Sequence, residues 1–316
     1  MSKIRFPRYQ IQDFLELIFG TVAIISAILT IITFFKEPPT YIYIIFMAVL
    51  FATSLTFFVL LIKFKIIAEN RLRHFPESFH KLTHLIRDEF YNLQRMHEDK
   101  KLSTEKLIDC LQKTAHESVN ILSLALSTST DRNISVCIKY FPIDEPILLR
   151  DEKDYKNISV KTLCRSSNSN LSRNAHSIHK VFDNTHFKKI MMEKLPHFSA
   201  YNIYELSDKL KDTTGMPYQN SNPNWEDYYK SAITVPIRME SKYVPKKISK
   251  SIHDGSYDLL GFVCVDSPST SAFRKNDIDF YVQYIKAYAD LLYQYFDRAY
   301  CYFQLLSAEE KRRDIK

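Results

Sequence analysis

Glycine is scarce in this sequence, and the shortage excludes several nucleotide-binding sites. The chain has 316 residues but only four glycines, Gly20, Gly215, Gly255 and Gly261, where about 7% is usual. A phosphate-binding P-loop needs two glycines five residues apart, and a dinucleotide fingerprint needs three close together. Neither spacing occurs, and a kinase glycine-rich loop is also missing. A nucleotide held on a glycine-rich loop is therefore excluded, whereas one held by side chains is not.

Closely spaced metal ligands are also lacking. None of the five cysteines forms a C-x-x-C pair, so neither a zinc site nor a thioredoxin motif is predicted. His80 and His84, like His176 and His179, lack the partner residues of a zinc site, and we expect them on the surface or in packing roles. No metal or cofactor is predicted. Three cysteines could be arranged for redox chemistry, although isolated buried thiols are the simpler interpretation: Cys137, Cys164 and Cys264.

The positive charge is concentrated at the N-terminus. The formal net charge is +7, of which residues 1–73 carry +4 (8 Lys and Arg, 4 Asp and Glu). The other 243 residues carry only +3 (35 against 32). This distribution fits attraction to an anionic membrane surface and gives no basic surface for DNA or RNA. We therefore expect no nucleic-acid partner.

Two long apolar runs predict a transmembrane hairpin over residues 1–65. The runs cover residues 14–35 and 41–62, and each would be about 33 Å long as a helix, enough to span a bilayer. The short link between them contains Pro38 and Pro39, which suit a tight turn. Lys and Arg flank the hairpin on both outer sides, so both termini are expected in the cytoplasm. The sequence thus predicts a multi-pass protein of the inner membrane, with the lipid bilayer as its partner.

The remaining sequence predicts an α+β domain behind a connecting helix. Residues 66–103 read as a helical connector, and Ser103 is a plausible N-cap for a helix reaching about residue 126. Alternating or β-branched runs predict strands over 134–141, 159–165, 231–238 and 258–266. The polar middle, 166–230, contains one expected short helix near 186–195. A long helix is predicted from about 276 to 311.

That last helix carries a heptad pattern of apolar residues. The pattern could pack on the protein's own sheet or face a partner helix, and the apolar face is wide enough for both. The second interpretation predicts a homodimer or higher oligomer. The residues of this expected dimer seam are Val282, Ile285, Ala289, Leu292, Phe296, Ala299, Phe303 and Leu306.

The C-terminal third resembles a GAF domain. The matching stretches are Ser231–Arg238 (SAITVPIR), Leu260–Asp266 (LGFVCVD) and Phe273 before the long helix. The resemblance covers residues 104–300, leaving 301–316 as the helix end and tail, and PAS-like folds are close competitors. It implies a sensory module whose antiparallel sheet has a small-molecule pocket on one face and dimerising helices on the other. The motifs of cyclic-nucleotide and bilin-binding GAF domains are missing, so the resemblance does not identify a ligand.

The polar middle supplies the candidate ligand-binding residues. An arginine with hydroxyl neighbours suits an anion such as a phosphate or carboxylate, and aromatic rings can stack on a planar ligand. Each group has a structural alternative: a solvated loop, a helix N-cap, or core packing of the only tryptophan. The candidates are Arg165, Ser166, Ser167, Asp183, Asn184, Thr185, Trp225, Tyr229 and Ser231.

No catalytic constellation stands out, and we expect a protein that is not an enzyme. The favoured hypothesis is a membrane-anchored small-molecule sensor that signals to a separate partner protein. The alternative makes the hairpin itself the output: ligand binding would trigger the two transmembrane helices to perturb the membrane, as in two-span effectors of antiphage defence.

Overall fold

The computed structural model describes most of the chain beyond residue 40. It describes residues 20, 30, 40–142, 147–148, 152–169, 178–222, 224–240, 243, 252–253 and 256–314. The chain divides into two compact units, Met1–Arg73 and His74–Lys316. The first predicted apolar run, 14–35, lies outside the described residues apart from Gly20 and Thr30.

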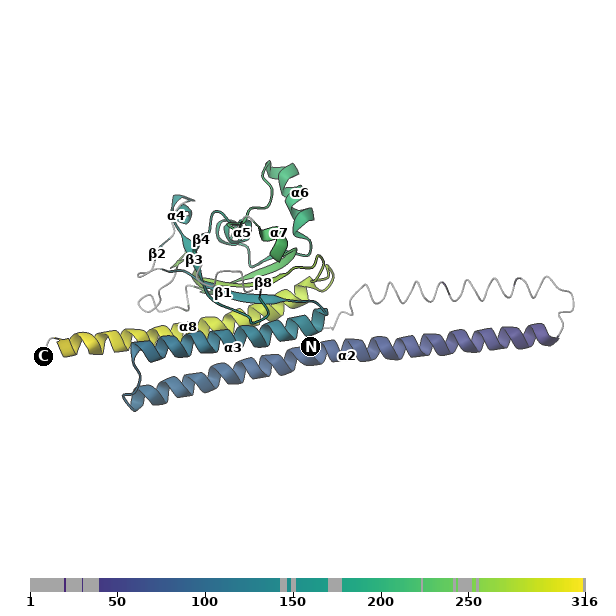
Figure 1. The fold of residues 1–316 in the computed structure, drawn as a ribbon, viewed down its shortest axis with the longest axis horizontal. Coiled ribbons are helices and arrows are strands. Elements are labelled where there is room, and N and C mark those ends of the chain that lie inside the picture. Colours follow the sequence, from purple (N-terminus) through teal and green to yellow (C-terminus); the bar gives the residue numbers. More distant parts are fainter. Residues whose placement is uncertain are drawn as a thin grey trace. The chain divides into compact units, whose positions relative to one another are not determined.

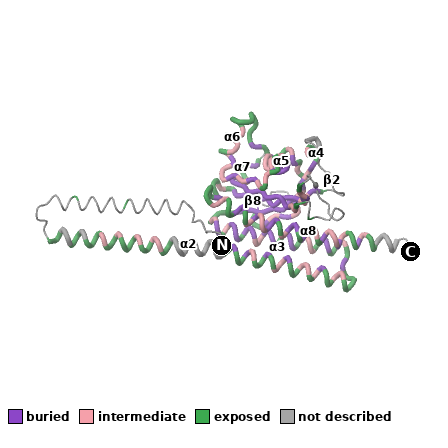
Figure 2. Tube along the Cα trace, turned by 180° about the vertical axis from the view of Figure 1, so that it is seen from behind, coloured by how far each residue is buried: buried purple, intermediate pink, exposed green. Residues whose placement is uncertain are grey.

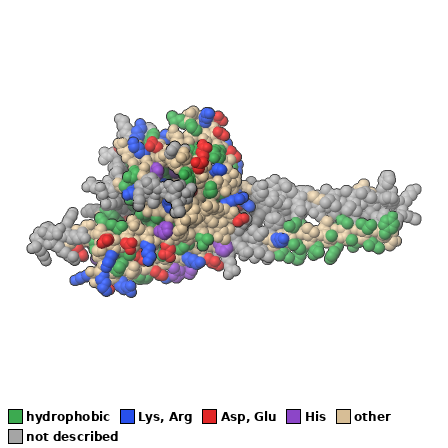
Figure 3. Space-filling view, in the orientation of Figure 1, with side chains coloured by type: hydrophobic (Ala, Val, Ile, Leu, Met, Phe, Trp, Pro, Cys, Tyr) green, Lys and Arg blue, Asp and Glu red, His purple; other side chains and the backbone are tan. Residues whose placement is uncertain are grey.

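The first unit contains the beginning of α2 (Thr40–Glu98). The second predicted apolar run, 41–62, is helical here, and many of its side chains are exposed (Figure 3). In the described part of the chain, no helix combines the length and apolarity that crossing a bilayer requires. The most exposed apolar side chains of this stretch include Ile44, Met47, Phe51, Leu55 and Phe58.

The second unit contains a layer of long helices. The predicted connecting helix is confirmed as the later part of α2, and the two other predicted long helices are confirmed as α3 (Thr104–Thr130) and α8 (Ile278–Asp314). The Ser103 hydroxyl accepts a hydrogen bond from the Lys106 amide at 3.3 Å, which confirms the predicted N-cap. Pro76 lies inside the continuous helix α2. Figure 1 shows α3 and α8 side by side along one face of the sheet.

Eight strands of the described residues form one largely antiparallel sheet. The strand order across the sheet is β5–β6–β8–β1–β3–β4. Beyond the end of β1, the short strand β7 pairs with the same edge of β8, and β2 pairs with β7. The four predicted strands are confirmed as β1 (Ser135–Tyr140), β3 (Ser159–Arg165), β6 (Ser231–Glu240) and β8 (Tyr257–Ser267). The short strands are β2 (Ile147–Leu148), β4 (Ile178–Lys180), β5 (Phe198–Ala200) and β7 (Ile252–His253). The α+β class is therefore confirmed.

Short helices cover the opposite face of the sheet (Figure 1). The predicted short helix is confirmed as α5 (Thr185–Met192). The polar middle also contains α6 (Ile203–Thr214) and α7 (Trp225–Tyr228), which the sequence analysis missed, and α4 (Glu152–Lys156) lies before β3.

The sheet is the most buried layer (Figure 2) and separates two hydrophobic clusters. Because strand side chains alternate between faces, β1 contributes Val136 and Ile138 to the helix-side core and Cys137 to the other.

The heptad residues of α8 are used within the chain itself. Val282, Ile285, Ala289 and Leu292 are buried in the core between α8 and the sheet. Ala299 and Leu306 are buried against α2 and α3, and only Phe296 and Phe303 remain partly exposed. These side chains fill a core of the chain itself, and the homodimer stays a prediction. The intramolecular alternative is the one that the packing supports.

Candidate functional site

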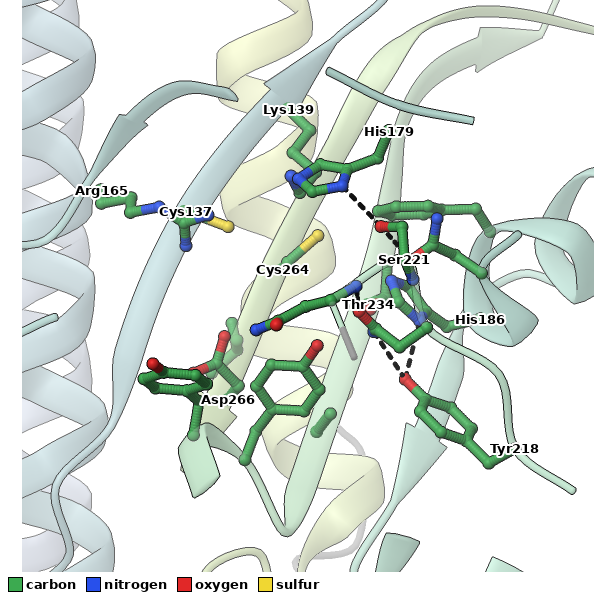
Figure 4. Close-up of a pocket in the computed structure, with 18 residues that line it drawn as sticks. Cys137, Lys139, Arg165, His179, His186, Tyr218, Ser221, Thr234, Cys264 and Asp266 are labelled. Carbon is green, nitrogen blue, oxygen red and sulfur yellow. Dashed lines mark hydrogen bonds between the residues drawn. The ribbon is translucent and has the colours of Figure 1, made fainter. Parts of the chain in front are cut away.

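A cavity of about 290 Å³ lies between the sheet and the loops around α5 and α7. Its walls carry several polar and titratable groups, shown in Figure 4. A pocket that combines aromatic rings with a few convergent polar groups is typical of a small-molecule site. The polar and sulfur-containing residues that line it include Cys137, Lys139, Arg165, His179, His186, Ser221, Thr234, Cys264 and Asp266.

The floor of the cavity is one row of residues across four strands. The register pairs Arg165 of β3 with Cys137 of β1, Cys137 with Cys264 of β8, and Cys264 with Thr234 of β6. All four side chains line the cavity. Directly opposed residues in antiparallel strands project from the same face, so the register itself assembles this row.

A β-bulge in β3 turns Arg165 into the cavity. The β1–β3 register shifts between Ile138 and Lys139, so that Leu163 is an extra residue on β3. Leu163 and Cys164 both pack against the helix-side core. In a regular strand Cys164 would lie on the same face as Thr162, and Arg165 would face the helices. Because of the extra residue, Cys164 faces the helices and Arg165 faces the cavity. The bulge is therefore what makes Arg165 available to a ligand.

Two cationic side chains share the cavity. Lys139 is buried, and its ammonium donates to the Thr162 hydroxyl at 3.0 Å. The buried Nε of Arg165 has no hydrogen-bond partner among the described residues. A buried donor that lacks a partner is costly, by about 1–3 kcal/mol. A bound acceptor would remove that cost, so Arg165 is the strongest single indication of a ligand site.

His186 forms a neutral hydrogen-bonded unit with Tyr218. The Asn220 amide donates to the Tyr218 hydroxyl at 3.5 Å, and Nδ1 of His186 lies 2.9 Å from that oxygen. Burial raises the pKa of Tyr218 above its ordinary value, so the phenol keeps its proton. Burial, together with the nearby Lys139 and His179, lowers the pKa of His186 to about 3. The imidazole is therefore uncharged at neutral pH and adds no positive charge to the cavity.

A second polar pair borders the cavity. The Ser221 hydroxyl hydrogen-bonds with Nδ1 of His179 (Figure 4), and it also donates to the side-chain oxygen of Asn184. The amide of Asn184 donates in turn to the Lys180 carbonyl at 2.7 Å. These contacts tie the loop before α7 to β4 and to the turn before α5, and so fix one wall of the cavity.

Three of the predicted ligand-binding residues line the cavity: Arg165, Asn184 and Tyr229. Trp225 does not line it; its ring is buried among Tyr204, Tyr218 and Tyr229, so the core-packing alternative holds.

The other predicted site residues have structural contacts instead. The Ser166 hydroxyl accepts from the Val136 amide, the Ser167 amide donates to Asn120, and the Ser231 hydroxyl donates to the Ser269 carbonyl. Thr185 is the first residue of α5, and its hydroxyl accepts from the Gln219 amide. Asp183 is exposed. These five residues therefore either hydrogen-bond within the chain or, like Asp183, face solvent.

Several cavity residues were missed by the sequence analysis. His179 was expected on the surface or in packing, and Lys139, His186 and Asp266 were not singled out. Alternation along β1 could have indicated Cys137 and Lys139, because Val136 and Ile138 occupy the other face. No local pattern indicated His186, because its position depends on how the polar middle folds back over the sheet.

No protein-family model matches the chain, and no curated protein is similar at a significant level. Solved structures with some likeness include a type II free methionine-R-sulfoxide reductase from Thermoplasma acidophilum, at 14% identity and TM-score 0.35, covering 58% of this chain and 96% of that one. A GAF domain of an Acinetobacter phosphoenolpyruvate-protein phosphotransferase has 12% identity and TM-score 0.34, covering 63% and 97%. A phycoerythrobilin-bound GAF domain of a cyanobacterial phytochrome has 10% identity and TM-score 0.38, covering 70% and 97%. The solved structures with some likeness to this chain thus include GAF domains, at TM-scores of 0.34 and 0.38.

Proposed function

We propose that residues 74–316 form a GAF-like sensory domain that binds a small anionic molecule in the cavity above the sheet. The observation that carries this proposal is the arrangement of Arg165 and Lys139 in one cavity, with the Arg165 Nε buried and lacking a partner among the described residues. An arginine fork recognises planar carboxylate or phosphate oxygens through charge-assisted hydrogen bonds.

Charge and shape both favour such a ligand. Lys139 and Arg165 provide two positive charges, Asp266 provides one negative charge, and His186 is neutral. Aromatic side chains from Phe187 and three tyrosines complete the walls and suit a ring or another planar group. The binding function needs no catalytic group.

The sheet offers a route for the signal. Residues of β1 alternate between the cavity and the core that β1 shares with α3 and α8. A ligand that moves Cys137 or Lys139 therefore displaces Val136 and Ile138 against those helices. We propose that this movement is read by a separate partner protein.

Arg165→Gln tests the binding function. The full chain, in detergent micelles, is purified as wild type, as Arg165→Gln and as the control Arg274→Gln, which changes an exposed arginine away from the cavity. Small molecules released by denaturation are identified by mass spectrometry, and binding of inorganic phosphate and acetate is measured by calorimetry. Loss of the buried charged donor should weaken anion binding about 10–100-fold. Equal anion content and affinity in all three proteins would overturn the proposal.

Membrane anchoring is the other part of the proposal. It is supported by the two apolar runs and by the exposed apolar side chains of α2 between residues 41 and 62. We propose an inner-membrane protein with both termini in the cytoplasm. Fractionation of cells and protease accessibility of tagged termini test this, and recovery of the full chain in the soluble fraction would contradict it.

The same exposed apolar stretch supports the second candidate function, a ligand-triggered effector that perturbs the membrane. Membrane potential, followed with a voltage-sensitive dye during induced expression, separates the two functions. Depolarisation by wild type but not by Arg165→Gln supports the effector, whereas an unchanged potential with intact anion binding supports the sensor.

A further inference from the structure

Cys137 and Cys264 form a pair on the floor of the cavity. The two residues are directly opposite each other on β1 and β8, and both line the cavity (Figure 4). Opposed residues of antiparallel strands have Cα atoms about 4.5–5.5 Å apart, which is within the ~4.4–6.8 Å that a disulfide spans. Both thiols are free in this structure. The backbone thus holds two thiols at a separation that one disulfide can close.

The neighbours of Cys137 favour its thiolate. On the side away from Cys264, the register places Arg165 directly opposite Cys137, and Lys139 is two residues along the same strand and lines the same cavity. The hydrogen bond from Cys264, with attraction to Arg165 and Lys139, lowers the pKa of Cys137, whereas burial raises the pKa of Cys264. The remaining charged or titratable groups that line the cavity are Asp266, His179, His186, Tyr218, Tyr228 and Tyr229. The pair is therefore asymmetric, with one nucleophilic sulfur and one protonated thiol beside it.

We propose that Cys137 and Cys264 are an oxidation site for hydrogen peroxide or a small organic hydroperoxide, with Cys137 as the nucleophile and Cys264 as the resolving thiol. The Cys137 thiolate attacks one peroxide oxygen, and the O–O bond breaks. The leaving oxygen takes a proton from water and departs as water or an alcohol, and Cys137 becomes a sulfenic acid. The Cys264 sulfur then attacks the Cys137 sulfur, the S–O bond breaks, and the thiol proton leaves with the hydroxyl group as water. Two electrons have passed from the two thiols to the peroxide, and the product is a cross-strand disulfide.

The other cysteines provide an internal comparison. Cys164 packs in the helix-side core, and burial raises its pKa to about 12. Cys110 and Cys301 are half-exposed on α3 and α8, and burial also raises their pKa values, that of Cys110 to about 11. If exposure alone decided reactivity, Cys110 and Cys301 would be oxidised first. If thiolate character and pairing decide it, Cys137 and Cys264 are oxidised first.

Mapping the oxidised cysteines tests the proposal. The full chain in detergent micelles is reduced, freed of reductant and treated with one equivalent of hydrogen peroxide at pH 7, and its peptides are analysed by mass spectrometry without reduction. We expect a linked Cys137–Cys264 peptide that forms at least ~10-fold faster than any modification of Cys110 or Cys301. Oxidation that begins at Cys110 or Cys301 overturns the proposal. This measurement involves no anion, so it succeeds or fails independently of the proposed binding function.

Single variants assign the two roles. In Cys264→Ser the disulfide cannot form, and dimedone should trap a sulfenic acid at Cys137. In Cys137→Ser, dimedone should not label Cys264, and Cys164→Ser should form the Cys137–Cys264 disulfide at the wild-type rate. Equal labelling of Cys264 in Cys137→Ser and of Cys137 in Cys264→Ser would refute the assigned roles. If a variant fails to fold, the mapping of the wild-type protein still decides whether this pair reacts first.

Discussion

Arg165 and Cys137 lie directly opposite each other on β3 and β1, on the face of the sheet that carries the cavity. This relationship depends on one extra residue, Leu163, which occupies the helix-side core together with Cys164. Bulges are frequent beside functional sites because they redirect a side chain without disturbing the rest of the strand. Here the redirected side chain is the arginine on which the proposed anion site depends.

Gly261→Ala should destabilise the sheet. A Cβ at this position would lie 1.9 Å from the Lys139 carbonyl oxygen and 2.9 Å from the Tyr140 Cα, both of which are backbone atoms. The strands β1 and β8 must separate to relieve the contact, and we expect the free energy of unfolding to fall by about 3 kcal/mol or more.

Gly215→Ala is the matched control for that substitution. Gly215 caps α6 with φ +73° and has open space around its Cα, so only the backbone conformation is strained. We expect a loss of about 1 kcal/mol. Thermal unfolding of both variants, followed by near-ultraviolet circular dichroism, shows which substitution costs more stability. Equal losses of stability would contradict the close backbone approach at Gly261.

Tyr293→Phe should remove one hydrogen bond from a buried carboxylate. The Tyr293 hydroxyl donates to Oδ2 of Asp258 at 2.7 Å, and both residues are buried. Loss of a donor to a buried charged group costs about 1.5–3 kcal/mol. Tyr300→Phe, on the same helix, removes only an exposed contact with Gln304 and should change stability by less than about 0.5 kcal/mol. Chemical denaturation of the two variants measures the difference.

Stability should decrease as the pH falls below about 6.5, in part because of His186. The pKa of His186 is lowered to about 3 in the folded protein, whereas an unfolded histidine titrates near 6.5. Between these two values the unfolded state binds a proton that the folded state does not, so acidification favours unfolding. The contribution of this one residue to the slope cannot exceed ~1.4 kcal/mol per pH unit, because the two states differ by at most one bound proton at His186.

His186→Gln provides the check on this pH dependence. Glutamine can hydrogen-bond with the Tyr218 hydroxyl but does not titrate, so the change in thermal stability between pH 7.5 and pH 5 should become smaller. The control is His116→Gln, which removes an exposed histidine whose ring lies 3.5 Å from the Ser167 hydroxyl. A wild-type slope in His186→Gln would show that another group carries the acid sensitivity.

The main elements could be predicted from the sequence, whereas most of the cavity could not. Apolar periodicity is a local property, and it placed the long helices and the four central strands. The face of the sheet that Arg165 occupies depends on a β-bulge. The bulge shifts the alternation of side chains between the two faces by one residue, and the sequence contains no pattern that predicts it. Lys139 lies on a strand where alternation predicts a polar, solvated face, and only the folded polar middle makes that face a buried one. His186 and Ser221 meet the sheet through contacts between residues far apart in the sequence, which no periodic pattern encodes.

The heptad residues of α8 should stabilise the monomer. Leu292 is 1% exposed and belongs to the core between α8 and the sheet, whereas Leu305, on the same helix, is 49% exposed. Leu292→Ala should therefore lower the free energy of unfolding by about 2–5 kcal/mol, and Leu305→Ala by less than about 0.5 kcal/mol. Thermal unfolding gives the stability, and sedimentation in detergent gives the oligomeric state of each variant. If Leu292→Ala dissociated an oligomer while leaving the unfolding temperature unchanged, the seam would serve a partner helix after all. If it lowered that temperature without changing the sedimentation coefficient, any self-association must use another surface.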